Sequence, residues 1–63
     1  MIEVVFCRDH PLRYLSYEMV AVLFSDAIFE GRLGMHWLGT GDPHAQALML
    51  ERIGDIQIKR EPK

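Results

Sequence analysis

The sequence predicts a small two-layer α/β (α+β) domain in the order strand, helix, strand, helix, strand, and three observations predict it. Two segments carry apolar residues at the three- and four-residue spacing of a helix, and each ends at a glycine. The segments around them alternate apolar and polar residues, as strands do. The 63 residues leave room for a single core. Two helices on one face of a three- or four-stranded sheet bury such faces economically.

The segment 2–7 is predicted to be the first strand. Ile2, Val4 and Phe6 are expected to share one face, because side chains alternate along a strand. Val5 and Cys7 make the opposite face apolar as well. A strand that is apolar on both faces is covered on both sides or lies centrally in its sheet.

The first helix is predicted over residues 17–30. Ser16 is a suitable N-cap, and Gly31 suits the left-handed residue that ends a helix. Between them, apolar residues recur at helical spacing. We expect Phe24 and Ile28 of this series to lie in the core.

Residues 32–38 are predicted to form the second strand, because Leu33, Met35 and Trp37 alternate with polar residues and glycine. Gly34 weakens this strand or marks a bulge. The segment 12–15 before the first helix is ambiguous: it fits either a short extra strand or an irregular lead-in.

The second helix, 43–53, carries the clearest signals. Asp42 can cap its free N–H groups, Pro43 fits the first helical position, and Gly54 suits its end. The alternating residues that follow predict a last strand over 55–60 with one buried face.

Composition limits the classes of function. A net charge of −2 gives no general attraction for nucleic acid. The N-terminal residues lack the pattern of a signal peptide, and the longest apolar run is too short to cross a bilayer. A single cysteine excludes an internal disulfide, and together with the missing export signal it predicts a cytoplasmic protein. We expect one domain over 1–63 with a frayed tail at 60–63, and no cofactor.

An apolar stripe on the polar side of the first helix is the main functional signal. Val22 and Phe29 are seven residues apart and therefore lie on one line along the helix, opposite its core-facing side. Glu18, Asp26 and Glu30 surround them. We call Val22 and Phe29 the outer stripe and these three acidic residues its rim. An apolar patch with a charged rim is typical of a protein interface. The structural alternative is that the C-terminal tail or the segment Leu12–Leu15 covers the stripe.

A metal or thiol site is a second hypothesis. The candidate ligands are Cys7, His10, His36 and His44. Cys7 and His10 could also act as nucleophile and base. Zinc motifs normally contain two tight pairs of ligands, and a cysteine that ends an apolar strand is usually an inert core residue. We therefore predict no metal ligands and no catalytic residues.

Nucleic-acid binding is a third hypothesis. It would use the four basic residues Arg8, Arg13, Lys59 and Arg60. Few basic residues accompany the aromatic ones, so this function is not expected.

The hypothesis that we favour is a non-enzymatic protein-binding or regulatory module of the inhibitor or adaptor type, such as phages and mobile elements encode. Its partner would be another protein, a second copy of the chain, or both. A 63-residue domain without a disulfide gains the most from such a partner.

Overall fold

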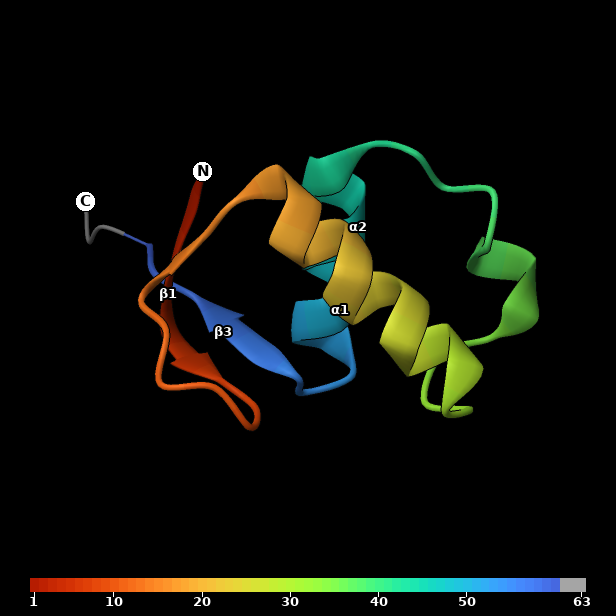
Figure 1. Cartoon of the computed structure of the whole chain (residues 1–63), viewed down its shortest axis with the longest axis horizontal. Helices are drawn as coiled ribbons and strands as arrows, with labels where there is room; N and C mark the ends of the chain where they lie inside the picture. Colours follow the sequence, from red (N-terminus) through yellow and green to blue (C-terminus); the bar gives the residue numbers. More distant parts are fainter. Residues whose placement is uncertain (61–63) are drawn as a thin grey trace.

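The computed structural model describes residues 1–60 and contains two helices packed on a three-stranded antiparallel sheet (Figure 1). This confirms the predicted fold class. In chain order the elements are β1 (Ile2–Cys7), β2 (Tyr14–Leu15), α1 (Tyr17–Phe29), the 3₁₀ turn η1 (Met35–Trp37), α2 (Pro43–Arg52) and β3 (Ile56–Ile58). The expected order strand, helix, strand, helix, strand was wrong, because η1 stands where the second strand was expected.

Both helices begin and end where their capping residues predict. The Ser16 hydroxyl accepts a hydrogen bond from the Met19 N–H at 3.1 Å, and the Asp42 carboxylate accepts one from the His44 N–H at 3.1 Å. Gly31 and Gly54 follow the helix ends with φ of +80° and +86°, a conformation that glycine adopts without a Cβ clash. The predicted helices at 17–30 and 43–53 are therefore confirmed to within one residue.

The sheet has the order β2-β1-β3, so the first strand is central. The short strand β2 pairs Tyr14 with Glu3 and Leu15 with Ile2, within the segment that the sequence left ambiguous. The last strand, β3, occupies the middle of the range predicted for it. Within residues 1–60 the sheet packs against the two helices on one side, and Phe6 and Tyr14 on its other face are exposed.

A β-bulge in β1 changes which residues face the helices. Val4 is paired with Ile58 and Phe6 with the next residue of β3, Gln57, so Val5 is an extra residue in the ladder. Beyond the bulge the alternation is reversed, and Cys7 is buried while Phe6 is exposed. The prediction that Phe6 shares the buried face of Val4 was wrong for this reason.

The segment 32–38 is not a strand, and its backbone hydrogen bonds explain why. The N–H groups of Arg32 and Leu33 both donate to the Ala27 carbonyl, at 2.9 and 3.2 Å, and so complete the end of α1. The Trp37 N–H then donates to the Gly34 carbonyl at 3.1 Å, which is the i→i+3 pattern of η1. Of the alternating apolar residues, Leu33 is buried and Trp37 half-buried, but Met35 is 69% exposed.

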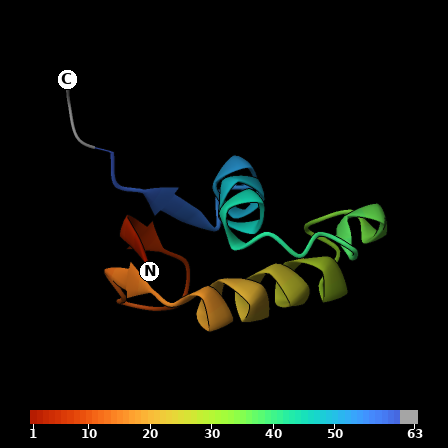
Figure 2. The same cartoon turned by 90° about the horizontal axis from the view of Figure 1, so that it is seen from above.

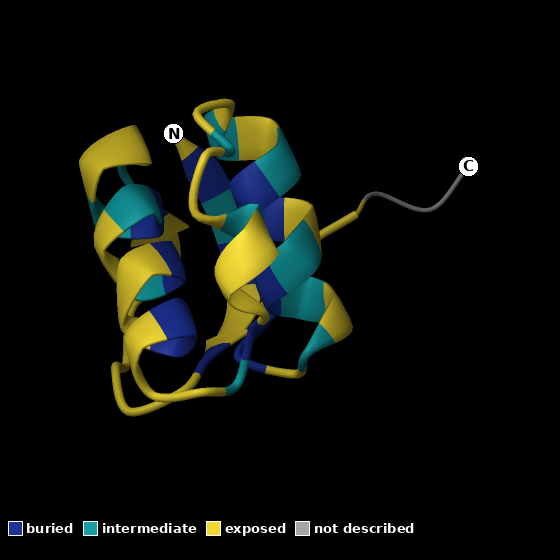
Figure 3. Ribbon diagram, turned by 90° about the vertical axis from the view of Figure 1, so that its right-hand side faces the viewer, coloured by how far each residue is buried: buried dark blue, intermediate teal, exposed yellow. Residues whose placement is uncertain are grey.

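The core lies between the helices and the inner face of the sheet. It contains the apolar residues Ile2, Val4, Cys7, Leu15, Val20, Phe24, Ala27, Ile28, Leu33, Ala47, Leu50 and Ile56. Phe24 and Ile28 are among them, as predicted. Figure 3 shows that both helices turn their buried residues toward each other and their exposed residues outward.

The long axis of the molecule is set by α1. Seen from above, the sheet lies near the start of this helix, α2 lies beside its middle and η1 lies beside its C-terminal end (Figure 2). Within residues 1–60, no helix has the length and apolar character needed to cross a bilayer. Residues 61–63 of the predicted frayed tail lie outside the described part of the chain.

Candidate functional site

The outer stripe lies on the solvent side of α1. The inner side of this helix consists of Val20, Phe24, Ala27 and Ile28, all buried. The outer stripe is on the opposite side, where Val22 is 52% exposed and Phe29 is 93% exposed. Seven residues of helix place these two side chains about 10 Å apart along the axis. Two apolar side chains therefore project into solvent from one line of a rigid element.

The rim of the stripe is acidic on both sides. Glu18 lies one turn before Val22, while Asp26 and Glu30 flank Phe29 on the other side of the line. All three side chains are exposed. Glu30 forms an ion pair with Arg32, the first residue after the glycine that ends α1. The rim therefore keeps a net negative charge around an apolar centre.

The segment Leu12–Leu15 does not cover the stripe. It leads into the N-terminal end of α1 through β2, whereas Phe29 is at the other end of the helix (Figure 1). With residues 1–60 in place, Phe29 keeps almost all of its surface in contact with solvent. That structural alternative was wrong; the alternative that residues 61–63 cover the stripe lies outside the described residues.

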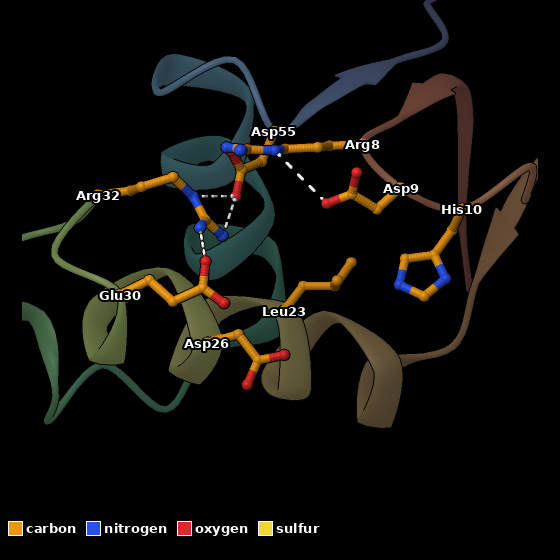
Figure 4. Close-up of a pocket in the computed structure, with 8 residues that line it drawn as sticks. All are labelled: Arg8, Asp9, His10, Leu23, Asp26, Glu30, Arg32 and Asp55. Atoms are coloured by element: carbon orange, nitrogen blue, oxygen red, sulfur yellow. Dashed lines mark hydrogen bonds and ion pairs between the residues drawn. The ribbon is translucent and has the colours of Figure 1, made fainter.

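A buried carboxylate at the start of β3 is a feature that the sequence did not reveal. Asp55 is the first residue of the strand predicted over 55–60, where the alternating pattern places polar residues on the outer face, but it is buried. Its Oδ2 accepts hydrogen bonds from Nε and Nη2 of Arg32 at 3.1 and 2.9 Å, and its Oδ1 lies 3.6 Å from Nη1 of Arg8 (Figure 4). The Arg8 N–H also donates to the Asp55 carbonyl at 2.8 Å. These contacts fasten the end of β1 and the segment after α1 to β3.

The hollow beside Asp55 is small, about 70 Å³, and opens between Arg8, Asp26 and Glu30 (Figure 4). Five of its six Arg, Asp and Glu residues pair with one another, Arg8 with Asp9 and Asp55 and Arg32 with Glu30 and Asp55, while Asp26 is in none of these pairs. This pairing gives the cluster a structural role in holding the ends of three elements together.

The candidate metal ligands lie apart from one another. His36 packs on Trp37 with ring centroids 5.0 Å apart, while His44 lies 3.3 Å from the hydroxyl of Tyr17. His10 is exposed in the turn after β1. Within the part of the chain that the structure describes, no three histidine, cysteine or acidic side chains are grouped so that they could hold a metal ion.

Cys7 is a buried thiol at the end of β1. Burial raises its pKa above the usual value of 9.0, and the carboxylates of Asp55 and Asp9 raise it further. Both effects disfavour the thiolate, which is the nucleophilic form of cysteine. The Cys7–His10 pair therefore lacks the electropositive setting that a catalytic thiol needs.

Three of the four basic residues considered for nucleic-acid binding are engaged with carboxylates. Arg8 pairs with Asp55, Lys59 with Glu3 at 3.2 Å, and Arg60 with Glu51 at 2.7 Å. Such pairing weakens the field that attracts phosphates.

Comparisons with protein-family models, with curated proteins and with solved structures find no significant match to this chain. The assignment of a function therefore depends on the geometry of the chain itself.

Proposed function

We propose that this protein is a non-enzymatic protein-binding module of the inhibitor or adaptor type, and that the outer stripe of α1 is its contact surface. The observation that carries the proposal is the 93% exposure of Phe29, a large apolar side chain held on a regular helix. Phe29 is not part of the core. An apolar pair with a charged rim has the anatomy of an interface.

The chemistry of the stripe defines the kind of partner. Burying Val22 and Phe29 removes apolar surface from water and stabilises a complex by about 1.5–3 kcal/mol for each fully buried side chain. Anchors seven residues apart on one helix fit an apolar groove, a common mode of helix recognition. The rim of Glu18, Asp26 and Glu30 favours basic residues at the edges of that groove.

The alternatives have less support. A thiol or metal function would need Cys7 to be accessible and ionised, and it is buried with a raised pKa. Nucleic-acid binding would need free cations, and Arg8, Lys59 and Arg60 are in ion pairs.

The proposal can be tested by photo-crosslinking. A photoreactive phenylalanine analogue at position 29 should capture a specific protein from lysate of the native host. The same analogue at position 48 provides the control, because Leu48 is an exposed apolar residue of the other helix, α2, 53% exposed. Capture from position 29 alone would identify the partner for quantitative measurement.

Binding to the captured partner is then measured with purified variants. Phe29→Glu should weaken binding at least about tenfold. Losing the burial of this side chain costs more than about 1.4 kcal/mol, and 1.4 kcal/mol corresponds to a factor of ten in Kd. Leu48→Glu, the matched change on α2, should leave Kd unchanged. Equal losses in the two variants, or wild-type affinity for Phe29→Glu, would overturn the proposal.

A further inference from the structure

The open face of the sheet is a second apolar surface. Glu3 and Tyr14 are cross-strand partners, as are Phe6 and Gln57; Tyr14, Phe6 and Gln57 are exposed and Glu3 is half-buried. Val5, Phe6 and Tyr14 are 58%, 49% and 57% exposed. We call these three residues the sheet patch. Part of this surface results from the β-bulge, which turns Phe6 outward.

The edge of the sheet patch is basic where the rim of the outer stripe is acidic. A hollow of about 260 Å³ opens beside Val5, and both Arg13 and Lys59 line it. Glu3 also lines this hollow but is paired with Lys59 through a 3.2 Å contact. Of the two cations in this lining, Arg13 is therefore the one without an ion pair among residues 1–60.

We propose that the sheet patch is the docking site for the outer stripe of a second copy of this chain. This inference rests on the proposed function, because the outer stripe is a contact surface in both proposals. It names a new surface, the sheet patch, and a specific occupant for it. The contact joins two different surfaces of identical molecules, so it is heterologous.

Charge complementarity favours this pairing over the contact of two stripes. A two-fold dimer through α1 would place Glu18, Asp26 and Glu30 close to their own copies, and like charges repel. Docking on the sheet patch instead brings the acidic rim toward Arg13 and Lys59. Asp26 flanks Phe29, so a Phe29 side chain over the hollow would place Asp26 beside Arg13, and neither residue is in an ion pair within residues 1–60.

The spacing of the two surfaces is also compatible. Val22 and Phe29 are about 10 Å apart along the axis of α1. Glu3 and Phe6 are also about 10 Å apart along β1. Tyr14 is the cross-strand partner of Glu3 and lies beside it. Phe29 can therefore lie near Tyr14 and the hollow while Val22 contacts Phe6. Aromatic pairs of this kind add stabilisation beyond the buried area.

A heterologous contact predicts a specific result when two variants are mixed. Phe29→Glu removes the stripe and leaves the sheet patch intact, whereas Phe6→Glu does the reverse. Each variant alone should stay monomeric in sedimentation equilibrium at concentrations where the wild type associates. An equimolar mixture should form a one-to-one dimer, because each partner supplies the surface that the other lacks.

A second variant and a control keep the test independent of folding. Arg13→Glu changes the same face without touching the strands' apolar residues, and it should weaken self-association at least tenfold. Leu48→Glu should associate as the wild type does. Wild-type association should also weaken with added salt, since the rim and Arg13 are exposed charges.

Two results would overturn this inference. One is a wild type that stays monomeric at millimolar concentration. The other is a wild type that associates while its two variants fail to complement each other. A two-fold dimer would give that result. Binding of Phe6→Glu to the partner captured through position 29 distinguishes the two proposals. If this binding persists while the wild type itself does not associate, only the sheet-patch inference fails.

Discussion

Phe24 and Phe29 show how position on one helix decides what the same side chain does. Phe24 is 3% exposed and packs in the core, whereas Phe29 projects into solvent. Phe24→Ala should reduce the free energy of unfolding by about 3–5 kcal/mol, the usual cost of removing a buried phenylalanine. That is a large part of the stability of a small domain. Urea unfolding followed by circular dichroism measures it.

The matched control is Phe29→Ala in the same helix. Its free energy of unfolding should stay within about 0.5 kcal/mol of the wild type at low protein concentration, as for most surface substitutions. Similar losses in the two variants would contradict the burial of Phe24 and the exposure of Phe29.

The thiol of Cys7 should be unreactive in the folded protein. Burial raises its pKa, and Asp55 and Asp9 raise it further, so little thiolate is present at neutral pH. Iodoacetamide should alkylate Cys7 slowly in buffer and rapidly in urea, with the adduct followed by mass spectrometry. A Ser25→Cys, Cys7→Ala double variant, with an exposed thiol on α1, provides the fast reference. Equal rates for the two folded proteins would show that Cys7 is accessible.

At the scale of elements, Glu51 fastens the end of α2 to β3. Its carboxylate accepts a hydrogen bond from the Ile58 N–H at 3.0 Å and two from the Arg60 guanidinium, both at 2.7 Å. The Arg60 hydrogen bonds, followed by the Ile58 N–H, hold the pKa of Glu51 below its usual 4.5. A carboxylate whose pKa is lower in the folded state stabilises the fold above its unfolded-state pKa. That contribution is lost as the pH falls through the folded-state pKa.

Glu51→Gln isolates this contribution. The variant should be less stable than the wild type at pH 7, and the difference in unfolding free energy should shrink as the pH falls well below about 4. Comparing the two proteins at each pH cancels the titration of the other groups. A difference that is the same at both pH values would show that the charge of Glu51 does not contribute.

The elements that the sequence predicted correctly carry local signals. Ser16 and Asp42 cap their helices, and Gly31 and Gly54 end them, so both helices could be placed without tertiary information. A strand was wrongly predicted at 32–38 because a strand and a helix end followed by a 3₁₀ turn can show the same pattern of apolar residues. Leu33 is buried after a helix end and Trp37 packs from a 3₁₀ turn, and their spacing imitates a strand.

Features that depend on pairing between distant segments could not be predicted. The β-bulge is set by the register of β1 against β3, and nothing local to Phe6 marks it. The sheet patch was missed for this reason. Asp55 meets Arg32 across 23 positions of sequence, so its burial could not be deduced from its neighbours in the chain. The outer stripe could be predicted, because its two residues belong to one helix.

At the scale of the whole molecule, the same two surfaces should make thermal stability depend on concentration. Self-association that requires the folded state stabilises it by mass action, and the thermal midpoint of the wild type should therefore rise with protein concentration. For a domain of this size each kcal/mol raises the midpoint by about 4–8 °C. Phe29→Glu and Phe6→Glu remove one surface each, so their midpoints should be independent of concentration.

The controls separate this effect from the intrinsic stability of the monomer. Leu48→Glu should follow the wild type at every concentration, because Leu48 belongs to neither surface. At high dilution the wild type and Phe29→Glu should converge on one midpoint, since Phe29 is exposed and is not part of the core. Differential scanning fluorimetry on Trp37, with refolding checked on cooling, measures all four proteins. A wild-type midpoint that does not change with concentration would mean that the outer stripe is exposed for a different partner, and that the chain folds as a monomer without help from its own copies.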